Sequence, residues 1–373
     1  MVHVVDTGRL GVSAGFPMHG DESVEASDGD AGPGARKVVA AVLASGLVAV
    51  FYARWWTGGS DPVVPGLPTA GAITRYGLPV AQYLQEIAGV AVVGLLFLRC
   101  LTLDDRSGPG HRHLARMAAR WGLMWVVSSV AWIAFTLSDL AGIPVTGLVS
   151  QPDLVFSLMG STRLLSETAT LWVALLVWLF AAAVSGKVTT VLLAAAAAGA
   201  LLPSALTGHA GHHNSEVALA TVSLGVHIVA ASVWVGGLLA LIVHLRRFPD
   251  LLGRAVRRFS AAALVCVAAV GVSGLLVGVI MTDSVMPGMQ GNGISGGALL
   301  DRVELLFATY RGQLILVKTA ALVVLTAIGY RHRSETVGPA SSGRLGPLLR
   351  LGAGELALMG ATIGVAVVLS TTA

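Results

Sequence analysis

This sequence contains few charged residues. Asp, Glu, Lys and Arg make up 12% of its 373 residues, 55% are hydrophobic, and the mean hydropathy is +0.78. An average soluble domain carries about twice that share of charge. The composition therefore excludes a soluble domain, and its long apolar stretches predict an all-α integral membrane protein.

Cysteine is also scarce. Cys100 and Cys266 form no Cys-x-x-Cys pair, and both fall toward the inner ends of predicted helices. We therefore expect neither a disulfide framework nor a thiolate metal site. The basic residues that set the pI near 9.4 lie in short loops between apolar stretches, so we expect no nucleic-acid partner.

The N-terminal 35 residues lack the basic and apolar regions of a signal peptide. They contain six acidic residues and little that could form a core, so residues 1–35 are predicted to be a disordered cytoplasmic tail.

A membrane span needs about 20 mostly apolar residues. About nine segments qualify: 36–56, 79–101, 118–141, 164–184, 187–206, 217–245, 258–281, 312–330 and 350–371. The prediction is a polytopic helical bundle with a five-helix region over 36–206 and a four-helix region over 207–373.

The basic residues predict the orientation. With the N-terminus inside, 18 of the 24 Lys and Arg residues fall in inner segments and five in outer segments. Because basic residues concentrate on the cytoplasmic side, we expect an N-in, C-out protein of the cytoplasmic (inner) membrane.

Three histidines occupy the predicted outer loop between the fifth and sixth spans: His209, His212 and His213. Imidazole is a common ligand of transition metals, and this loop has no Lys or Arg. The pattern favours metal capture at the outer face. The alternative is a solvated loop that binds no metal, which could have the same sequence.

His227 lies ten residues into the sixth predicted span, about 15 Å below its outer edge at 1.5 Å per residue. An ionisable side chain at this depth indicates a functional site. The alternative is a neutral histidine bonded to a neighbouring helix. His213 is too distant to share an ion with it, so the two would be successive stations on a path.

Three methionines follow the seventh predicted span: Met281, Met286 and Met289. Thioether sulfur selects Cu(I), and we expect these residues on the same side as the histidine loop. Methionine is also an ordinary filler of apolar gaps, so both interpretations remain open.

Four charges fall within predicted spans. Glu86 is expected near the level of His227 and could belong to the ion path, with Lys318 neutralising it. Glu167 and Arg163 are four residues apart and could form a purely structural pair. Glu355 is expected nearer the inner face, away from Lys318.

The last 165 residues or so resemble the copper resistance protein D (CopD) family of bacterial inner-membrane proteins. The resemblance rests on His227 with Trp234-Val235-Gly236-Gly237-Leu238, on Arg258-Phe259-Ser260, on Thr309-Tyr310-Arg311-Gly312-Gln313-Leu314 before Lys318, and on Gly354-Glu355-Leu356. It implies copper binding and transport rather than catalysis, with copper-binding roles for His227 and the loop histidines. We see no soluble copper-binding domain, so we expect a separate extracytoplasmic donor protein.

Two other functions compete with a copper permease. A haem or electron-transfer protein would need a second histidine at matching depth, and the predicted helices offer only His244, near the inner end. A copper chaperone or sensor would bind the metal outside without moving it.

Overall fold

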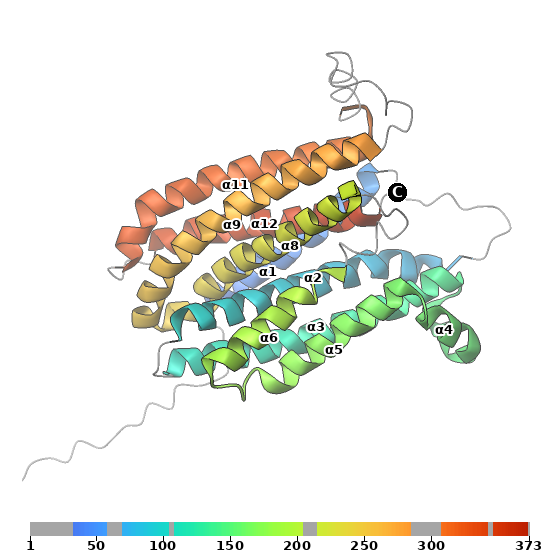
Figure 1. The fold of residues 1–373 in the computed structure, drawn as a ribbon, viewed down its shortest axis with the longest axis horizontal. Coiled ribbons are helices and arrows are strands. Elements are labelled where there is room, and N and C mark those ends of the chain that lie inside the picture. The colour runs from blue at the N-terminus through green and yellow to red at the C-terminus, as the bar shows by residue number, and fades with distance from the viewer. Residues whose placement is uncertain are drawn as a thin grey trace, which may run out of the picture.

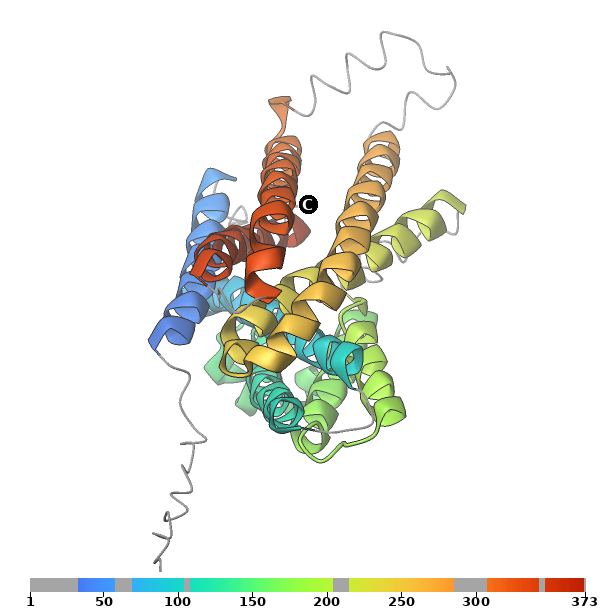
Figure 2. The same cartoon turned by 90° about the vertical axis from the view of Figure 1, so that its left-hand side faces the viewer.

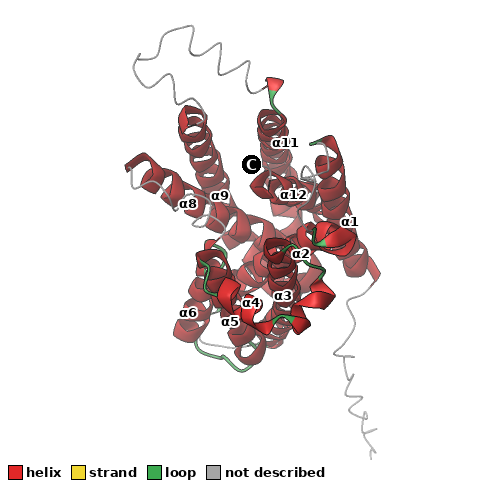
Figure 3. Cartoon of the chain, turned by 90° about the vertical axis from the view of Figure 1, so that its right-hand side faces the viewer, coloured by secondary structure: helices red, strands yellow, loops and turns green. Residues whose placement is uncertain are grey.

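The computed structural model describes residues 33–57, 69–103, 108–203, 215–284, 307–341 and 346–371. Their regular structure is helical, with no strand among them (Figure 3). The expected all-α polytopic bundle is therefore confirmed. The histidine loop and residues 1–32 lie outside the described residues.

The helices lie roughly along one axis (Figure 1). In chain order they are α1 (Pro33–Trp56), α2 (Gly71–Thr102), α3 (Pro109–Ala141), the 3-10 helix η1 (Val145–Ser150), α4 (Pro152–Met159), α5 (Thr162–Phe180), α6 (Lys187–Gly199), α8 (Ser215–Leu239), the π-helix η2 (Ala240–His244), the 3-10 helix η3 (Leu245–Arg247), α9 (Pro249–Ser284), α11 (Tyr310–Ser341) and α12 (Gly346–Thr371).

Eight helices of the described part are long and apolar enough to cross a membrane. They correspond to eight of the nine predicted spans. The remaining segment, predicted over 187–206, forms the 13-residue helix α6, which ends at Gly199. At 1.5 Å per residue α6 is about 20 Å long, shorter than the hydrocarbon core of about 30 Å.

Two helices begin well before their predicted starts. The second span was predicted from residue 79, but α2 begins at Gly71 and contains Pro79 in its interior. The third was predicted from residue 118, but α3 begins at Pro109, a residue suited to the first turn of a helix. The first part of α3 contains arginines, so it is not apolar and hydropathy alone does not predict it. The helix extends beyond its apolar stretch.

Helix α2 lies at the centre of the bundle. It packs against α3 and α6 on one side and against α8, α9 and α12 on the other. In the 18-residue apolar stretch of α2, 72% is buried inside the protein, compared with 11% in that of α9. Views along the bundle show α3 to α6 grouped on one side of α2, and α8, α9, α11 and α12 on the other (Figures 2 and 3).

Small residues let two distant helices meet at the edge of the bundle. Helix α1 packs on α12, although the two are separated by most of the chain. A Cβ atom on Gly360 would lie 2.7 Å from the carbonyl oxygen of Val42, and one on Gly364 would meet that of Gly46. This small-xxx-small spacing is typical of closely packed membrane helices.

We call the end of the bundle where α1 ends and α2 begins the expected outer end. The end where α2 ends and α3 begins is the expected inner end. The N-in, C-out orientation itself stays a prediction.

Candidate functional site

His227 is held against the neighbouring helix α9. Its Nδ1 lies 3.2 Å from the carbonyl oxygen of Val270 and 3.3 Å from Oγ of Ser273. A carbonyl oxygen only accepts, and the Ser273 hydroxyl donates to Ala269. Nδ1 must therefore carry the imidazole proton, and the lone pair is on Nε2.

This arrangement is typical of metal-binding histidines, in which the second ring nitrogen donates to a carbonyl or carboxylate and so fixes the ring. It is also the interhelical bond of a neutral packing histidine. Among the described residues nothing hydrogen-bonds Nε2, and the residue is partly rather than fully buried. Nε2 is thus available to a ligand.

Glu86 lies on α2 in a polar group shared with α12. The amide nitrogen of Gln82, one turn away, donates to Oε1 of Glu86 over 3.4 Å and is 3.2 Å from Oγ of Ser370. The amide oxygen of Gln82 is buried without a hydrogen-bond partner. Such an orphan acceptor keeps a hydrogen-bonding capacity that the described residues do not satisfy.

Lys318 of α11 is the cation of this region. It lies within electrostatic range of both Glu86 and His227, and its side chain is partly buried. The fold thus brings together three ionisable side chains from α2, α8 and α11. We call Glu86, His227 and Lys318 the central triad.

The central triad offers two metal-binding groups, one imidazole and one carboxylate. No group of three or more His, Cys, Asp or Glu side chains in the described residues is arranged to enclose a metal ion. A cation here would have to complete its coordination with other groups, and the Lys318 ammonium would repel it. The geometry fits a site of transient contact better than a closed structural site.

Several of the predicted ligands cannot be located. His209, His212, His213, Met286 and Met289 lie outside the described residues. Met281 belongs to the last turn of α9, but its side chain is also outside the described part. Their roles therefore remain predictions from sequence.

A second buried polar cluster lies on the other face of α2. Gln85 donates from Nε2 to Oε2 of Glu167 on α5 over 3.1 Å. Both side chains are nearly inaccessible, at 6% and 4% exposure. The predicted Arg163–Glu167 pair is only partly right, since Arg163 stays within electrostatic range but lies over the ring of Trp132, 5.7 Å from its centroid.

Helix α3 adds polar atoms to this second cluster. Buried side-chain atoms without a hydrogen-bond partner occur at Trp125, Ser129, Trp132 and Thr136, spaced by three or four residues along one face. A Cβ atom on Gly89 would touch Trp125, so Gln85, one turn away on this antiparallel pair, lies near the level of Ser129. Of these neighbouring residues, Gln85 bonds Glu167 directly, whereas Glu86 bonds Gln82 and has Glu167 only within electrostatic range.

This second cluster and the two glutamines, Gln82 and Gln85, were not predicted from the sequence. The pattern Gln82, Gln85 and Glu86 in an otherwise apolar stretch was the available signal, because buried amides in a membrane need partners.

The prediction that His244 is the only helical histidine besides His227 is wrong. Because α3 begins at Pro109, His111 and His113 are helical and join His244 near the expected inner end. The rings of His113 and His244 are 5.9 Å apart between centroids, and Trp121 donates to Nε2 of His244 over 3.3 Å. Nε2 of His111 lies 2.9 Å from the carbonyl oxygen of Thr102. These nitrogens already have partners within the protein.

The two adjacent glycines in the sequence near His227 pack closely rather than lining an opening. A Cβ atom on Gly236 would meet the carbonyl oxygen of Val90 on α2, and one on Gly237 would meet the ring of Phe259 on α9. The Cβ positions of both glycines are therefore taken up by the packing of α8 against α2 and α9.

Two family patterns match the chain. Residues 73–219 match the family described as "Copper resistance protein D-like, N-terminal domain", and residues 253–369 match "Copper resistance protein D". "Copper transport protein CutJ" from Bacillus subtilis (strain 168) is 25% identical over 342 residues, which cover 87% of this chain and 51% of that protein. The chain thus spans about half the length of this relative. No solved structure matches the present chain.

The two matched regions cover more than two thirds of the sequence, and most of the first lies N-terminal to the stretch in which the sequence resemblance was found. The chain is a multi-pass membrane protein that belongs to the copper resistance protein D family.

Proposed function

We propose that this protein binds copper ions at its outer face and moves them across the cytoplasmic membrane toward the cytoplasm. The histidines of the outer loop (His209, His212, His213), with thioether ligands from Met281, Met286 and Met289, capture the ion. His227 then receives it inside the membrane. The reaction is ligand exchange only, without catalysis.

The orientation of His227 is the observation that carries this proposal. The Nδ1 hydrogen bond to Val270 fixes the ring and leaves the Nε2 lone pair free within a membrane helix. Imidazole accepts either oxidation state of copper. An ion crossing hydrocarbon needs such ligands at intervals, since a bare charge there is prohibitively costly.

Glu86 and Lys318 give the site its charge balance. With no ion present, the Lys318 ammonium lies within electrostatic range of the Glu86 carboxylate, so neither charge is isolated in the membrane. An arriving copper ion would take the place of this ammonium beside Glu86. The same positive charge then favours release of the ion, which a transporter needs.

The family membership and the name of the Bacillus subtilis relative both support copper as the cargo. We further propose that a separate extracytoplasmic copper-binding protein delivers the ion to the outer loop.

Copper accumulation in cells, together with uptake into membrane vesicles, tests the proposal. We expect His227→Ala to abolish uptake while the protein is still produced and its outer loop still binds copper. The matched control is His244→Gln, which removes an imidazole from the same stretch of helix at the opposite end of the membrane and should leave most uptake intact.

Uptake by His227→Ala at the wild-type rate would make His227 a packing residue. Copper binding without accumulation by the wild type would instead indicate a chaperone or sensor. A Soret band in the visible spectrum of the purified protein would favour a haem protein.

A further inference from the structure

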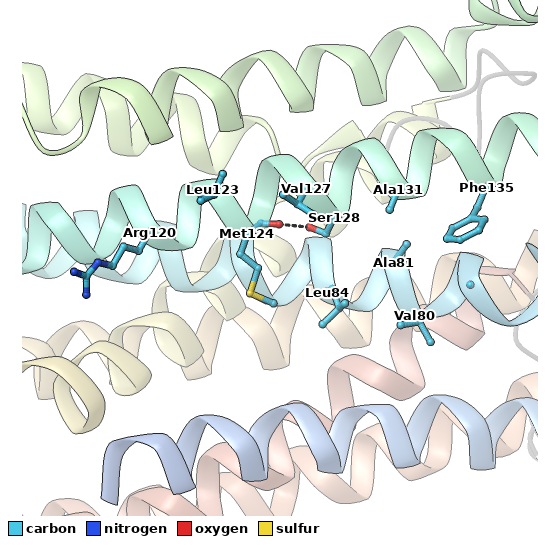
Figure 4. A pocket seen from close by; sticks show the side chains of 11 residues that line it. Val80, Ala81, Leu84, Arg120, Leu123, Met124, Val127, Ser128, Ala131 and Phe135 are labelled. Carbon is cyan, nitrogen blue, oxygen red and sulfur yellow. Dashed lines mark hydrogen bonds between the residues drawn. The ribbon is translucent and has the colours of Figure 1, made fainter. Parts of the chain in front are cut away.

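An apolar groove of about 620 Å³ runs along the surface between α2 and α3 (Figure 4). Gly77, Val80, Ala81 and Leu84 line it from α2. Because two of these four residues are small, the surface is hollowed there. The groove is separate from the central triad, since it faces away from Glu86 on the same helix.

The groove contains almost nothing that could hold water. Its one hydroxyl, that of Ser128, donates to the carbonyl oxygen of Met124 in its own helix over 2.8 Å (Figure 4). Its open side carries exposed apolar side chains, including Leu123 at 42% and Val127 at 62%. A dry apolar groove at a membrane-facing surface fits a hydrocarbon chain.

The length of the groove also fits such a chain. Along α3 it extends from Arg120 to Phe135, which is about 22 Å at 1.5 Å per residue. One leaflet of a hydrocarbon core is about 15 Å deep, so the groove is long enough for an acyl chain of that leaflet. The ring of Phe135 closes the far end, where a Cβ atom on Gly77 would lie 2.5 Å from it.

The other end of the groove is basic. Arg120 lines it there, and Arg112 and Arg116 continue on the same face of α3 at four-residue spacing, beyond the apolar part of the helix. Arg120 is exposed, its Nη1 lies 4.0 Å from the sulfur of Met117, and no carboxylate of the described residues pairs with it. An anionic headgroup on these arginines would continue directly into the groove.

We propose that this groove is a binding site for an anionic phospholipid. One acyl chain lies between α2 and α3, and the phosphate-bearing headgroup is bound by Arg120 together with the preceding arginines of α3. The lipid belongs to the leaflet at the expected inner end. This assignment does not depend on the copper function.

Native mass spectrometry of the purified full-length protein with added phosphatidylglycerol or phosphatidylcholine tests the site. We expect phosphatidylglycerol to bind more tightly, and Arg120→Gln to weaken it about fivefold, as expected for one lost arginine contact at a membrane surface. Arg257→Gln removes an exposed arginine at the same end of the bundle, on α9, and should leave this binding unchanged.

A second pair of variants tests the position of the acyl chain. Ala131→Phe fills the groove and should remove the tightly bound lipid, whereas Val130→Phe adds the same ring to the adjacent exposed position and should not. Val127→Trp serves as a second filler if Ala131→Phe fails to fold.

Equal binding of the two lipids, or equal effects of Arg120→Gln and Arg257→Gln, would overturn the headgroup assignment. Unchanged lipid binding in both filled variants would overturn the groove. A change in the oligomeric mass of Ala131→Phe, with lipid binding unaltered, would show that a second copy of the chain occupies it instead.

Discussion

Gly94 of α2 and Gly236 of α8 meet backbone to backbone at the centre of the bundle. A Cβ atom on Gly94 would meet the main chain of Gly236, and one on Gly236 would come within 3.0 Å of the Cα atom of Gly94 and meet the carbonyl oxygen of Val90. This crossing holds the helix of His227 against the helix of Glu86. The positions of Glu86 and His227 relative to each other therefore depend on it.

We expect Gly236→Ala to destabilise the protein by about 1–3 kcal/mol or more, because backbone atoms cannot yield as a flexible side chain can. The free energy of unfolding in detergent measures this. Gly271→Ala is the matched control, since a Cβ atom there meets nothing within 4 Å. Equal stability of the two variants would show that α2 and α8 are not in this contact.

The Gln85–Glu167 hydrogen bond predicts strong coupling between the two residues. Glu167→Leu leaves the buried amide of Gln85 without its acceptor, at a cost of about 1–3 kcal/mol. Adding Gln85→Leu should recover part of that loss. A double-mutant cycle of unfolding free energies measures the coupling, and additive losses would contradict the bond.

Glu86→Gln removes the negative charge of this side chain but keeps its size and its ability to form hydrogen bonds. The glutamine can still bond Gln82, so we expect a folded protein. Copper uptake should fall at least tenfold, because the carboxylate that balances the ion and Lys318 at this position is lost. Adding Lys318→Met should restore production if it has dropped, but not uptake. Normal uptake by Glu86→Gln would remove Glu86 from the path.

Copper binding by the outer loop should weaken as the pH falls through about 6.5, because protonated imidazole cannot coordinate a metal. Titration of purified protein with copper at several pH values measures this. The triple variant of His209, His212 and His213 to Ala should lose the affinity and its pH dependence. An unchanged affinity in that variant would show that the loop does not bind copper.

The N-in, C-out orientation predicts an extracytoplasmic C-terminus. An alkaline phosphatase fusion after Ala373 should be active in bacteria, and a fusion within residues 104–107, between α2 and α3, should be inactive. The reverse pattern would invert the topology and place the histidine loop in the cytoplasm.

The helical membrane fold and copper as the expected cargo could be predicted from the amino-acid sequence. Hydropathy locates spans because every backbone polar group in a bilayer must be bonded within its own helix. The copper prediction rests on motifs such as that of His227 and Trp234, whose residues are close together in the sequence and can be recognised without the fold. Helix starts were less predictable, as at Pro109, because a helix can continue into water with arginines on its surface.

Which side chains contact one another became clear from the packing of the helices in three dimensions. Gln85 and Glu86 are neighbours in sequence, but successive residues of a helix point about 100° apart, so one faces Glu167 and the other Lys318. Likewise, the sequence does not show which helix Gly236 contacts, whereas the packing places it against Val90 and Gly94 of α2. Contacts between helices depend on their rotation and depth, which hydropathy does not encode.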